Sequence, residues 1–500
     1  MKKRAYISVS NKENIIELAK TLTSNNYEIV STGGTFKLLK ENGINATEIS
    51  DITGYPEMLS GKVKSLHPEV FAGILADPSN LSEAKEIQLN KLKTFDMVVV
   101  NLYPFEKIAK ETDNIDKLIE NIDIGGVSLL RAGAKNYKNV TVITEITDYE
   151  NAINANESER EKLALKAFAR TAEYDTHIRA KLGEIFGDNE IKTYSFEKIN
   201  SLRYGENPHQ KAALYTCPDI ANYEVLWGKE LSYNNILDMT SAVNIVSEFY
   251  DVPAAVIIKH TAPCGVALGK DIVDAYKKAF DCDPISAFGG IVAVTQEVNE
   301  SLAKLLSSVF LEIVIAPDYD ENALDILKEK KNLRIVKLNT SLEDYKKIAN
   351  DEIKVTPFGV LIQNPDKKEL DKTSFNVVTK KKPTAEQIED AVFAWKVAKH
   401  AKSNAIVIAK DFKTLAIGQG QTSRICSMEW ALNFACDGTK DAVLASDGFL
   451  PAIDNVQAAA QGRIALIIQP GGSIKDQDVT SEANKYNIAM ITTGIRHFRH

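Results

Sequence analysis

The chain has 500 residues, of which 26% are charged and 44% hydrophobic, and its formal net charge is −8. The length predicts two to four domains, and the composition is that of a globular chain rather than a disordered one. The negative balance argues against nucleic acid as an obligatory partner, because binding it requires an excess of Lys and Arg. No window of about 18 residues is free of charge, so the sequence predicts no membrane-spanning helix.

The N-terminus and the cysteines favour a cytoplasmic protein. The opening MKKRAYISVS has too short an apolar stretch before Lys12 and Glu13 for a signal peptide. The five cysteines are odd in number and form no C-x-x-C pair. That pattern fits free thiols in a reducing compartment.

Short buried strands alternate with amphipathic helices in the first 195 residues. Predicted strands lie at 5–9, 27–31, 95–105 and 139–146, and predicted helices at 15–22, 125–136 and 159–186. This alternation predicts an α/β domain with a doubly wound parallel sheet. Its sites are expected at the carboxyl ends of the strands.

From Asn200 onwards the sequence is denser in Tyr, Asn and Gly, which indicates a second domain. Buried apolar strings alternate there with predicted helices at 236–250, 385–401 and 475–487. The segment DPISAFGGIVAV at 283–294 weakly resembles LASDGFLPAIDNV at 444–456. This similarity suggests two similar halves that meet near residue 375, although a chance match explains it equally well.

The turn STGGT at 31–35 joins a predicted strand to a predicted helix. Backbone N–H groups, the hydroxyls of Ser31 and Thr32 and the positive helix start can together bind an anion. Ser10 and Lys12 follow the first strand and are expected at the same edge of the sheet. A purely structural Gly-Gly turn would have the same sequence, and the motif is neither a Walker loop nor G-x-G-x-x-G.

A segment without periodicity at 60–75 contains Lys62, Lys64 and His67. It is either a solvated loop or a place where lysines meet a phosphate or a developing oxyanion. His67-Pro-Glu matches the H-x-E of zinc deaminases. Their P-C-x-x-C partner motif has no second cysteine after Cys264, which argues against a zinc site.

Four side chains of different chemistry are expected in one crevice of the first domain. They are an amide, a phenol, a carboxylate and an amine, from Asn101, Tyr103, Asp123 and Lys135. Asp123 could instead cap the helix that follows it, or do both.

The string KHTAPCG at 259–265 has several interpretations besides an ordinary strand end and turn. His260 suits proton transfer near neutral pH, and the neighbouring Lys259 can stabilise an oxyanion. Cys264 lies between Pro and Gly without a helix start that would lower its pKa, so a thiol nucleophile is disfavoured. Farther on, Arg424 in GQGQTSRICS can hold a phosphate or a carboxylate through two N–H groups.

Nine motifs occur in an order that is highly specific as a set. They are STGGT, VKSLHP, NLYPF, IDIGGVSLLRAGAKN, LRYGENPHQ, KHTAPCG, AFGG, GQTSR and SDGFLPAIDN. Over nearly all its length the chain resembles the bifunctional purine-biosynthesis family that joins AICAR (phosphoribosylaminoimidazolecarboxamide) formyltransferase to IMP cyclohydrolase. The resemblance implies a methylglyoxal-synthase-like cyclohydrolase domain at 1–195. It implies a transformylase region at 196–500, built from two cytidine-deaminase-like units, and a homodimer.

The resemblance also implies two consecutive reactions. The first transfers a formyl group from 10-formyltetrahydrofolate, as co-substrate, to the amine of AICAR. The second closes the ring to IMP with loss of water, and neither reaction is expected to need a catalytic metal. The substrates are small molecules, with no nucleic acid or membrane partner.

The site residues that follow from the resemblance form two groups. The cyclohydrolase substrate would contact Ser10, Lys12, Ser31, Thr32, Gly33, Gly34, Lys62, Lys64, Ser65 and Asn101, and cyclisation would be assisted by Lys64, Tyr103, Asp123 and Lys135. In the transformylase, His260 would take the proton of the amine with Lys259 beside it. The nucleotide would contact Arg203, Tyr204, Gly289, Glu312, Asn404, Arg424, Phe449 and Arg496, and the folate Asp454, Ser473 and Ile474.

Two positions depart from the family pattern. Ala262 stands where many relatives have a polar residue, and Glu312 stands where some have Asp.

Two rival functions remain for the first 195 residues: a methylglyoxal-synthase-like lyase, and a regulatory module that senses a phosphorylated ligand without turning it over. A sensor would not need Tyr103, Asp123 and Lys135.

Overall fold

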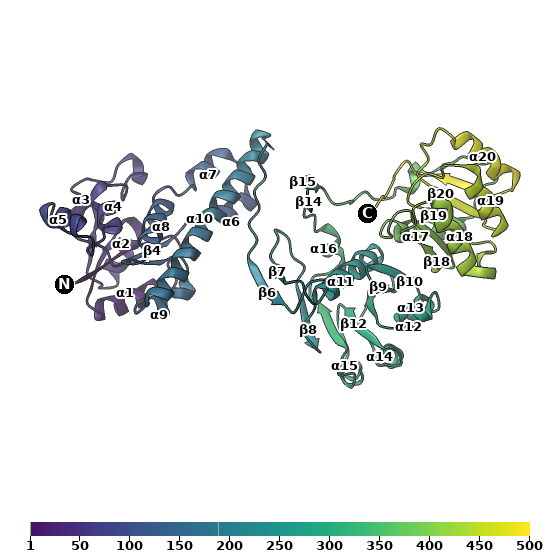
Figure 1. Cartoon of the computed structure of the whole chain (residues 1–500), viewed down its shortest axis with the longest axis horizontal. Helices are drawn as coiled ribbons and strands as arrows, with labels where there is room; N and C mark the ends of the chain where they lie inside the picture. Colours follow the sequence, from purple (N-terminus) through teal and green to yellow (C-terminus); the bar gives the residue numbers. More distant parts are fainter. Residues whose placement is uncertain (1, 189) are drawn as a thin grey trace. The chain divides into compact units, whose positions relative to one another are not determined.

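The computed structural model describes residues 2–188 and 190–500, which form two compact units (Figure 1). One unit ends at Ser195 and the other begins at Phe196. Both combine helices with a central sheet, which confirms the predicted α/β class. None of the helices in this described part is long and apolar enough to cross a membrane.

The first unit is built on a five-stranded parallel sheet with the order β3-β2-β1-β4-β5. Its strands are β1 (Lys3–Val9), β2 (Tyr27–Ser31), β3 (Ala46–Glu48), β4 (Met97–Asn101) and β5 (Thr141–Ile143). The chain moves outward from β1 to one side and then crosses to β4 on the other. Sheets with such a reversal bind ligands at the switch point, which here lies at the carboxyl ends of β1 and β4.

Helices cover both faces of this sheet (Figure 1). They are α1 (Ile15–Ser24), α2 (Gly33–Glu41), α3 (Ile49–Thr53), α4 (Pro68–Leu75), α5 (Leu81–Leu89), α6 (Phe105–Glu111), α7 (Ile115–Glu120), α8 (Gly125–Lys135), α9 (Tyr149–Ala152) and α10 (Glu157–Phe186), with 3₁₀ turns η1 (Leu59–Gly61) and η2 (Ile146–Asp148). One core packs α4, α8 and α10 against the sheet, and the other packs α1 and α2.

The second unit has a continuous twelve-stranded sheet with the order β16-β21-β20-β19-β17-β18-β10-β9-β11-β12-β13-β8. Its strands are β8 (Tyr223–Trp227), β9 (Ala254–Lys259), β10 (Ala262–Leu268), β11 (Gly290–Val294), β12 (Leu311–Ala316), β13 (Arg334–Leu338), β16 (Asn376–Val377), β17 (Ile406–Lys410), β18 (Lys413–Gly418), β19 (Val443–Ser446), β20 (Leu466–Gln469) and β21 (Ala489–Thr492). Two separate hairpins are formed by β6 (Lys198–Leu202) with β7 (Ala212–Tyr215), and by β14 (Glu352–Thr356) with β15 (Gly359–Gln363).

The large sheet is a duplication. Its first half has the order β10-β9-β11-β12-β13 and its second half the order β18-β17-β19-β20-β21, so each half repeats the same sequence of strands and hairpins. The halves meet where β10 pairs antiparallel with β18, which relates them by a twofold rotation. This repeated strand order supports the expectation of two similar halves, and their division near residue 375 stays a prediction.

The sequence similarity that suggested this duplication does not mark equivalent segments. Residues 283–294 lead into β11, whereas residues 444–456 begin inside β19 and continue into the helix after it. β19 is the structural counterpart of β11, but β11 lies at the end of the first segment and β19 at the start of the second. The matched residues are therefore not structurally equivalent, and the similarity between the two segments is a coincidence.

The helices of the second unit also repeat. They are α11 (Tyr233–Val246), α12 (Ile272–Phe280), α13 (Pro284–Ala287), α14 (Glu300–Ser307), α15 (Glu321–Lys328), α16 (Leu342–Lys347), α17 (Ala385–Ala398), α18 (Arg424–Ala435), α19 (Ile453–Gln461) and α20 (Asp476–Lys485), with 3₁₀ turns η3 (Ser247–Phe249), η4 (Lys372–Ser374) and η5 (Cys436–Thr439). The counterparts α11 and α17 share one core on one face of the sheet. On the other face each half has its own core.

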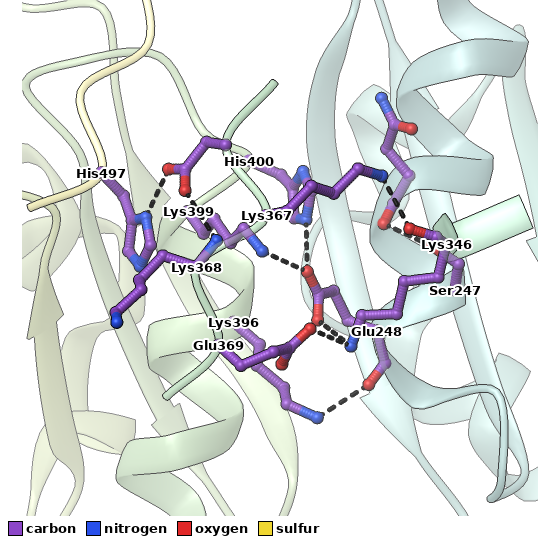
Figure 2. Close-up of polar contacts among 12 residues, drawn as sticks. Ser247, Glu248, Lys346, Lys367, Lys368, Glu369, Lys396, Lys399, His400 and His497 are labelled. Carbon is purple, nitrogen blue, oxygen red and sulfur yellow. Dashed lines mark hydrogen bonds and ion pairs between the residues drawn. The ribbon is translucent and has the colours of Figure 1, made fainter. Parts of the chain in front are cut away.

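A buried carboxylate links α11 and α17 beyond this shared core. Glu248, in the 3₁₀ turn after α11, is only 4% exposed. Figure 2 shows its Oε1 atom beside Lys399 Nζ (2.8 Å) and His400 Nε2 (3.1 Å), and its Oε2 atom beside Lys346 Nζ (3.0 Å). Lys396 Nζ donates to its backbone oxygen at 2.8 Å. Glu248, which belongs to the first half, thus contacts α16 of the same half through Lys346 and binds the second half through Lys399 and His400.

The charges around Glu248 decide its protonation. Burial raises the pKa of this carboxyl, but the hydrogen bonds and charges of His400 and Lys399 outweigh burial, so the pKa lies well below its usual range. Burial lowers the pKa of His400. The carboxylate is therefore ionised at neutral pH and is the counter-ion of the almost fully buried Lys399.

Candidate active sites

In the first unit, Asn101 at the end of β4 fixes the loop that follows β1. Its Oδ1 atom accepts the N–H groups of Ser10 (2.5 Å) and Asn11 (2.9 Å), and its Nδ2 donates to the Asn11 oxygen at 2.9 Å. Three hydrogen bonds of the Asn101 side chain thus hold the two strand ends together. Its position beside the crevice is as predicted, and its hydrogen bonds show why an amide serves there.

Two lysines lie over the Gly-Gly start of α2. A Cβ atom placed on Gly33 would lie 3.1 Å from Lys64 Nζ, and one on Gly34 would lie 3.7 Å from Lys12 Nζ. Gly33 also has a φ of +55°, which glycine adopts without strain. The free N–H groups of a helix start and two ammonium groups converge here, and such a place attracts a phosphate. Lys64 is meanwhile paired with Glu57 at 2.8 Å.

The sequence suggested that the hydroxyls of Ser31 and Thr32 bind an anion, but the structure shows these two hydroxyls in different surroundings. Ser31 is fully buried and its O–H donates to the Ile7 oxygen at 2.7 Å, so that the hydroxyl links β2 to β1. Thr35 Oγ1 accepts the Val9 N–H at 3.1 Å and so ties α2 to β1. Thr32 is the N-cap residue of α2 without a side-chain cap, which leaves its hydroxyl available.

Asp123 caps α8, which is one of the two roles that the sequence left open for it. Its Oδ1 atom accepts the Gly126 N–H at 2.7 Å in the first turn of α8, and its own N–H donates to Tyr174 Oη at 2.9 Å. Burial raises the pKa of Asp123, and hydrogen bonds from the Gly126 and Tyr103 backbone oppose the rise. Ser65 lies nearby, with its Oγ 3.4 Å from where a Cβ of Gly125 would be. A partly desolvated carboxylate that remains fixed in place can act as a base.

Three other predicted residues lie apart from this group. Lys135 is the last residue of α8, about 15 Å along the helix axis from Gly125 at 1.5 Å per residue. Since α8 returns across the sheet to the start of β5, this lysine is exposed at the opposite edge and its side chain is too short to reach Asp123. Lys62 is exposed. His67 caps α4 by accepting the Glu69 N–H at Nδ1 (3.2 Å).

In the second unit, Lys259 and His260 lie at a tight hairpin turn. β9 ends at Lys259 and β10 begins at Ala262, and the two residues between them, His260 and Thr261, have φ values of 54° and 62°. This is the geometry of a two-residue I′ turn, which normally requires Gly or Asn. Lys259 Nζ donates to the Phe288 oxygen at 2.8 Å. The structure thus shows the strand end and turn that the sequence suggested, with Lys259 and His260 as its residues.

Asp238 on α11 supports this turn, and sequence reasoning missed it. Its Oδ1 atom accepts the Thr261 N–H at 2.6 Å. Burial raises the pKa of Asp238, opposed by the hydrogen bonds from Thr261 and His260 and by the His260 charge. The signal in the sequence is weak, because an Asp in the middle of an amphipathic helix normally indicates only a solvated face.

Further predicted residues lie at the same edge of the sheet. The pairing of Ile291 with Ile258 and with Ile313 places Gly289 and Glu312 beside the end of β9. Glu312 Oε2 accepts Asn235 Nδ2 at 2.8 Å. In the loop after β6, the Arg203 guanidinium lies 5.6 Å from the centre of the Tyr204 ring.

The second half contributes a buried arginine to this edge. The Arg424 guanidinium, 6% exposed, donates to Asp447 Oδ1 (2.5 Å), Ser446 Oγ (2.9 Å) and Asn404 Oδ1 (2.9 Å). The carboxylate that it holds is thus one of the protein's own. Asn404 Nδ2 in turn donates to the Gln421 oxygen at 3.0 Å. Phe449 is partly exposed just after this group, and Arg496 lies over the Phe498 ring at 4.4 Å.

An open cavity of about 460 Å³ joins the two halves. Its lining includes Lys259, His260 and Ala262 from the first half and Gln419, Gln421 and Trp430 from the second. The antiparallel pairing of β10 with β18 explains this neighbourhood, because it brings the start of β10 to the end of β18. With Ala at position 262, no polar side chain projects into the cavity from there.

The predicted folate residues flank the carboxyl ends of β19 and β20. Asp454 lies in the first turn of α19, where its Oδ1 accepts the Asn455 N–H at 2.7 Å. Ser473 and Ile474 follow two glycines with positive φ, and Ile474 is fully exposed. A second open cavity, of about 390 Å³, lies beside Gly471 and Gly472.

Cys264 lines the cavity of His260 but is not an activated thiol. Burial raises its pKa to about 12, so the thiolate needed for nucleophilic attack is scarce at neutral pH. Among residues 2–188 and 190–500, no group of three or more His, Cys, Asp and Glu side chains is placed to hold a metal ion.

The fold of each unit agrees with the comparisons to known proteins. The family model for the MGS-like domain matches residues 14–128, which defines the class of the first unit. The model for the AICARFT/IMPCHase bienzyme matches residues 133–433, more than half of the chain.

Whole-length relatives agree with both models. The chain is 51% identical to the bifunctional purine biosynthesis protein PurH of Caldicellulosiruptor saccharolyticus and 49% identical to that of Thermoanaerobacter sp., with 100% of both chains covered in each case. It is 45% identical to PurH of Bacillus subtilis, covering 100% of this chain and 99% of that one. The chain belongs to the AICARFT/IMPCHase bienzyme family.

Membership establishes the two reactions. The protein is a bifunctional AICAR formyltransferase and IMP cyclohydrolase and catalyses the last two steps of de novo IMP biosynthesis. Its substrates are small molecules, and 10-formyltetrahydrofolate is the co-substrate of the first step.

Proposed function

We propose that the first unit closes the ring and that the second transfers the formyl group. The observation that supports the first assignment is the convergence of Lys12 and Lys64 on the Gly33–Gly34 helix start. It would hold the nucleotide phosphate, with Thr32 and the Ser10 loop beside the ribose. The crevice at the switch of strand order then continues toward Ser65 and Asp123.

Ring closure needs a base and a group that stabilises negative charge. The carboxamide nitrogen of formyl-AICAR attacks the formyl carbon and loses one proton. The former formyl oxygen then leaves as water, and the former amino nitrogen loses the second proton as its double bond to that carbon forms. We assign the acceptance of the proton to Asp123 and the stabilisation of the oxyanion to Lys64, because a fixed charge stabilises an opposite charge most effectively in a desolvated site. Tyr103 contributes a backbone N–H to Asp123 and a phenol at the crevice. Lys135 lies at the other end of α8 from Asp123.

We expect Asp123→Asn to lower kcat of ring closure by about 10²- to 10⁴-fold, the usual contribution of a general base. The amide keeps an oxygen for the Gly126 N–H, so the start of α8 remains capped. Formyl transfer should be unchanged. The measurement is IMP formation from supplied formyl-AICAR by ultraviolet absorbance, and Lys135→Ala, at the far end of the same helix, is the matched control with wild-type rate. An Asp123→Asn enzyme that closes the ring normally would contradict the assignment.

For formyl transfer we propose the cavity that carries Lys259 and His260. The amine of AICAR is a weak nucleophile, because its lone pair is delocalised into the ring and the carboxamide. As the nitrogen attacks the formyl carbon, His260 takes its proton, and the bond from that carbon to N10 of the folate breaks. Lys259, anchored on the Phe288 oxygen, holds a positive charge beside the tetrahedral oxyanion.

The remaining contacts are proposed from their places at the same edge. Arg203, Tyr204, Gly289, Glu312, Asn404, Arg424, Phe449 and Arg496 would bind the nucleotide, and Asp454, Ser473 and Ile474 the folate. Because the guanidinium of Arg424 is committed to Asp447, it would act mainly by fixing Asn404 and its neighbours.

We also propose that the protein is a cytoplasmic homodimer. The hairpin of β14 and β15 supports the dimer, because two strands alone are marginally stable and its side chains are exposed. Phe358 is fully exposed, and Val355 and Leu361 are 79% and 62% exposed. Exposed apolar clusters of this kind mark interaction surfaces, and a second copy of the chain is the occupant that the family resemblance implies.

Phe358→Asp should convert the dimer to monomers, because a charge at the centre of an apolar interface is desolvated without a partner. Sedimentation velocity or light scattering measures this directly. The control is Leu81→Asp, at a leucine of the first unit that is 83% exposed. A wild-type chain that sediments as a monomer, or a Phe358→Asp chain that still dimerises, would contradict the proposed interface.

A further inference from the structure

The duplication of the second unit places the turn of His260 beside a counterpart in the other half. The hairpin of β17 and β18 also turns through two residues with positive φ, Asp411 (52°) and Phe412 (55°). It corresponds to His260 and Thr261 in the hairpin of β9 and β10. The twofold relation puts this second turn at the opposite edge of the sheet, where the Leu268 N–H donates to the Phe412 oxygen at 2.9 Å.

Both turns rest on a carboxylate from the equivalent helix. In the first half, Asp238 on α11 accepts the Thr261 N–H at 2.6 Å. In the second half, Asp390 on α17 accepts the N–H groups of Asp411 (3.0 Å) and Phe412 (2.8 Å). Burial raises the pKa of both carboxyl groups, and the turn N–H groups oppose the rise in both. The fold thus contains the same support twice.

The support has a clear physical purpose. Residues other than Gly and Asn resist positive φ, and a β-branched residue such as Thr261 resists it most. A carboxylate that accepts hydrogen bonds from the turn N–H groups, charge-assisted and partly desolvated, stabilises the strained backbone. In the second half the turn carries Asp411 and Phe412, and nothing in the proposed chemistry depends on it.

We infer that Asp238 is a positioning residue for formyl transfer, whose carboxylate fixes the backbone of the turn that presents His260 to the substrate amine. This inference rests on the proposed role of His260. Asp238 accepts no proton from the substrate and acts through the turn. A base must lie within hydrogen-bond reach of the proton that it takes, and a displacement of about 1 Å can cost about 10²-fold in rate.

The second half supplies the matched control for the test. Asp238→Ala and Asp390→Ala each remove one carboxylate from beneath one turn, so their effects on stability should be alike. Asp238→Ala should lower kcat of formyl transfer by about 10- to 100-fold while KM for AICAR and folate stays near wild type. Asp390→Ala should leave kcat unchanged, and both variants should close the ring of supplied formyl-AICAR at the normal rate.

A conservative variant separates position from folding. Asp238→Asn keeps an oxygen for the Thr261 N–H and should recover most of the lost kcat. If Asp238→Ala does not fold in the full-length chain, Asp238→Ser is compared with Asp390→Ser, because serine is too short to reach the turn N–H groups, and only Asp238→Ser should lose kcat. Wild-type kcat in Asp238→Ala, or equal losses of kcat in Asp238→Ala and Asp390→Ala, would overturn the inference.

His260→Ala, measured in parallel, distinguishes this inference from the proposed function. If His260→Ala loses formyl transfer while the two aspartate variants behave alike, the role of His260 stands and the role of Asp238 falls. If His260→Ala retains formyl transfer, the proposed base is wrong, and the positioning role falls with it.

Discussion

His260→Ala should lower kcat of formyl transfer by about 10²- to 10⁴-fold, because it removes the group proposed to take the proton of a weakly nucleophilic amine. The expected result is confined to one reaction. Ring closure of supplied formyl-AICAR should proceed at the wild-type rate, since the proposed cyclohydrolase crevice belongs to the other compact unit. Formation of formyl-AICAR and IMP is followed separately by chromatography and mass.

Two controls sharpen this experiment. His67→Ala removes a histidine that caps α4 in the first unit and should leave formyl transfer unchanged. Cys264→Ser changes a thiol in the same cavity as His260 and should also leave it nearly unchanged, since burial keeps that thiol protonated. Equal losses of both activities in His260→Ala would contradict two separate sites, and inactivation by Cys264→Ser would restore the thiol nucleophile as a hypothesis.

Glu248→Gln should lower the free energy of unfolding of the second unit by about 3 to 5 kcal/mol, the usual cost of removing one partner from a buried ion pair. The ammonium of Lys399, 8% exposed in its side chain, would remain buried without its counter-ion. All three tryptophans, Trp227, Trp395 and Trp430, lie in the second unit. Tryptophan fluorescence during urea unfolding therefore reports on that unit alone.

The pH dependence of this effect has a definite sign. Because the pKa of Glu248 is lowered in the folded protein, its contribution to stability is complete above the pKa of an unfolded Glu, about 4.3, and is lost as the pH falls below it. The gap between wild type and Glu248→Gln should narrow by about 1.4 kcal/mol for each pH unit below that value. Glu343→Gln, which breaks an exposed pair with Lys347, is the control and should not change stability. A constant gap from pH 7 to pH 3 would contradict the ionised, buried carboxylate.

Local patterns in the sequence were sufficient to predict the architecture of the first unit and to bring several candidate site residues to one edge of its sheet. The period of apolar residues predicted the parallel sheet, and strand ends then placed Ser10, Thr32 and Asn101 at one edge. Lys135 shows the limit of this reasoning. Its place in a motif beside Asp123 suggested proximity, but the eleven-residue helix between them separates the two by its full length.

The second unit was harder to predict because its organisation depends on long-range pairing. Nothing local in β10 or β18 shows that they join two halves of one sheet. The tight turn at His260 lacks the Gly or Asn that normally indicates such a hairpin. The turn is stabilised instead by a hydrogen bond to Asp238, which is distant in the sequence, and the role of Asp238 was therefore missed. Arg424 was predicted to bind an anion and does so, but the anion is Asp447 of the same chain.

The two carboxylate-supported turns also bear on how a duplicated enzyme can specialise. After duplication, side chains at the tip of each hairpin were free to diverge, because the aspartate beneath, and not the identity of the tip residue, maintains the bend. Lys410 still occupies the place of Lys259 and still anchors its ammonium on a backbone oxygen, that of Lys440 at 3.1 Å. One copy could therefore retain or acquire a base while the other lost it, without either half having to change its fold.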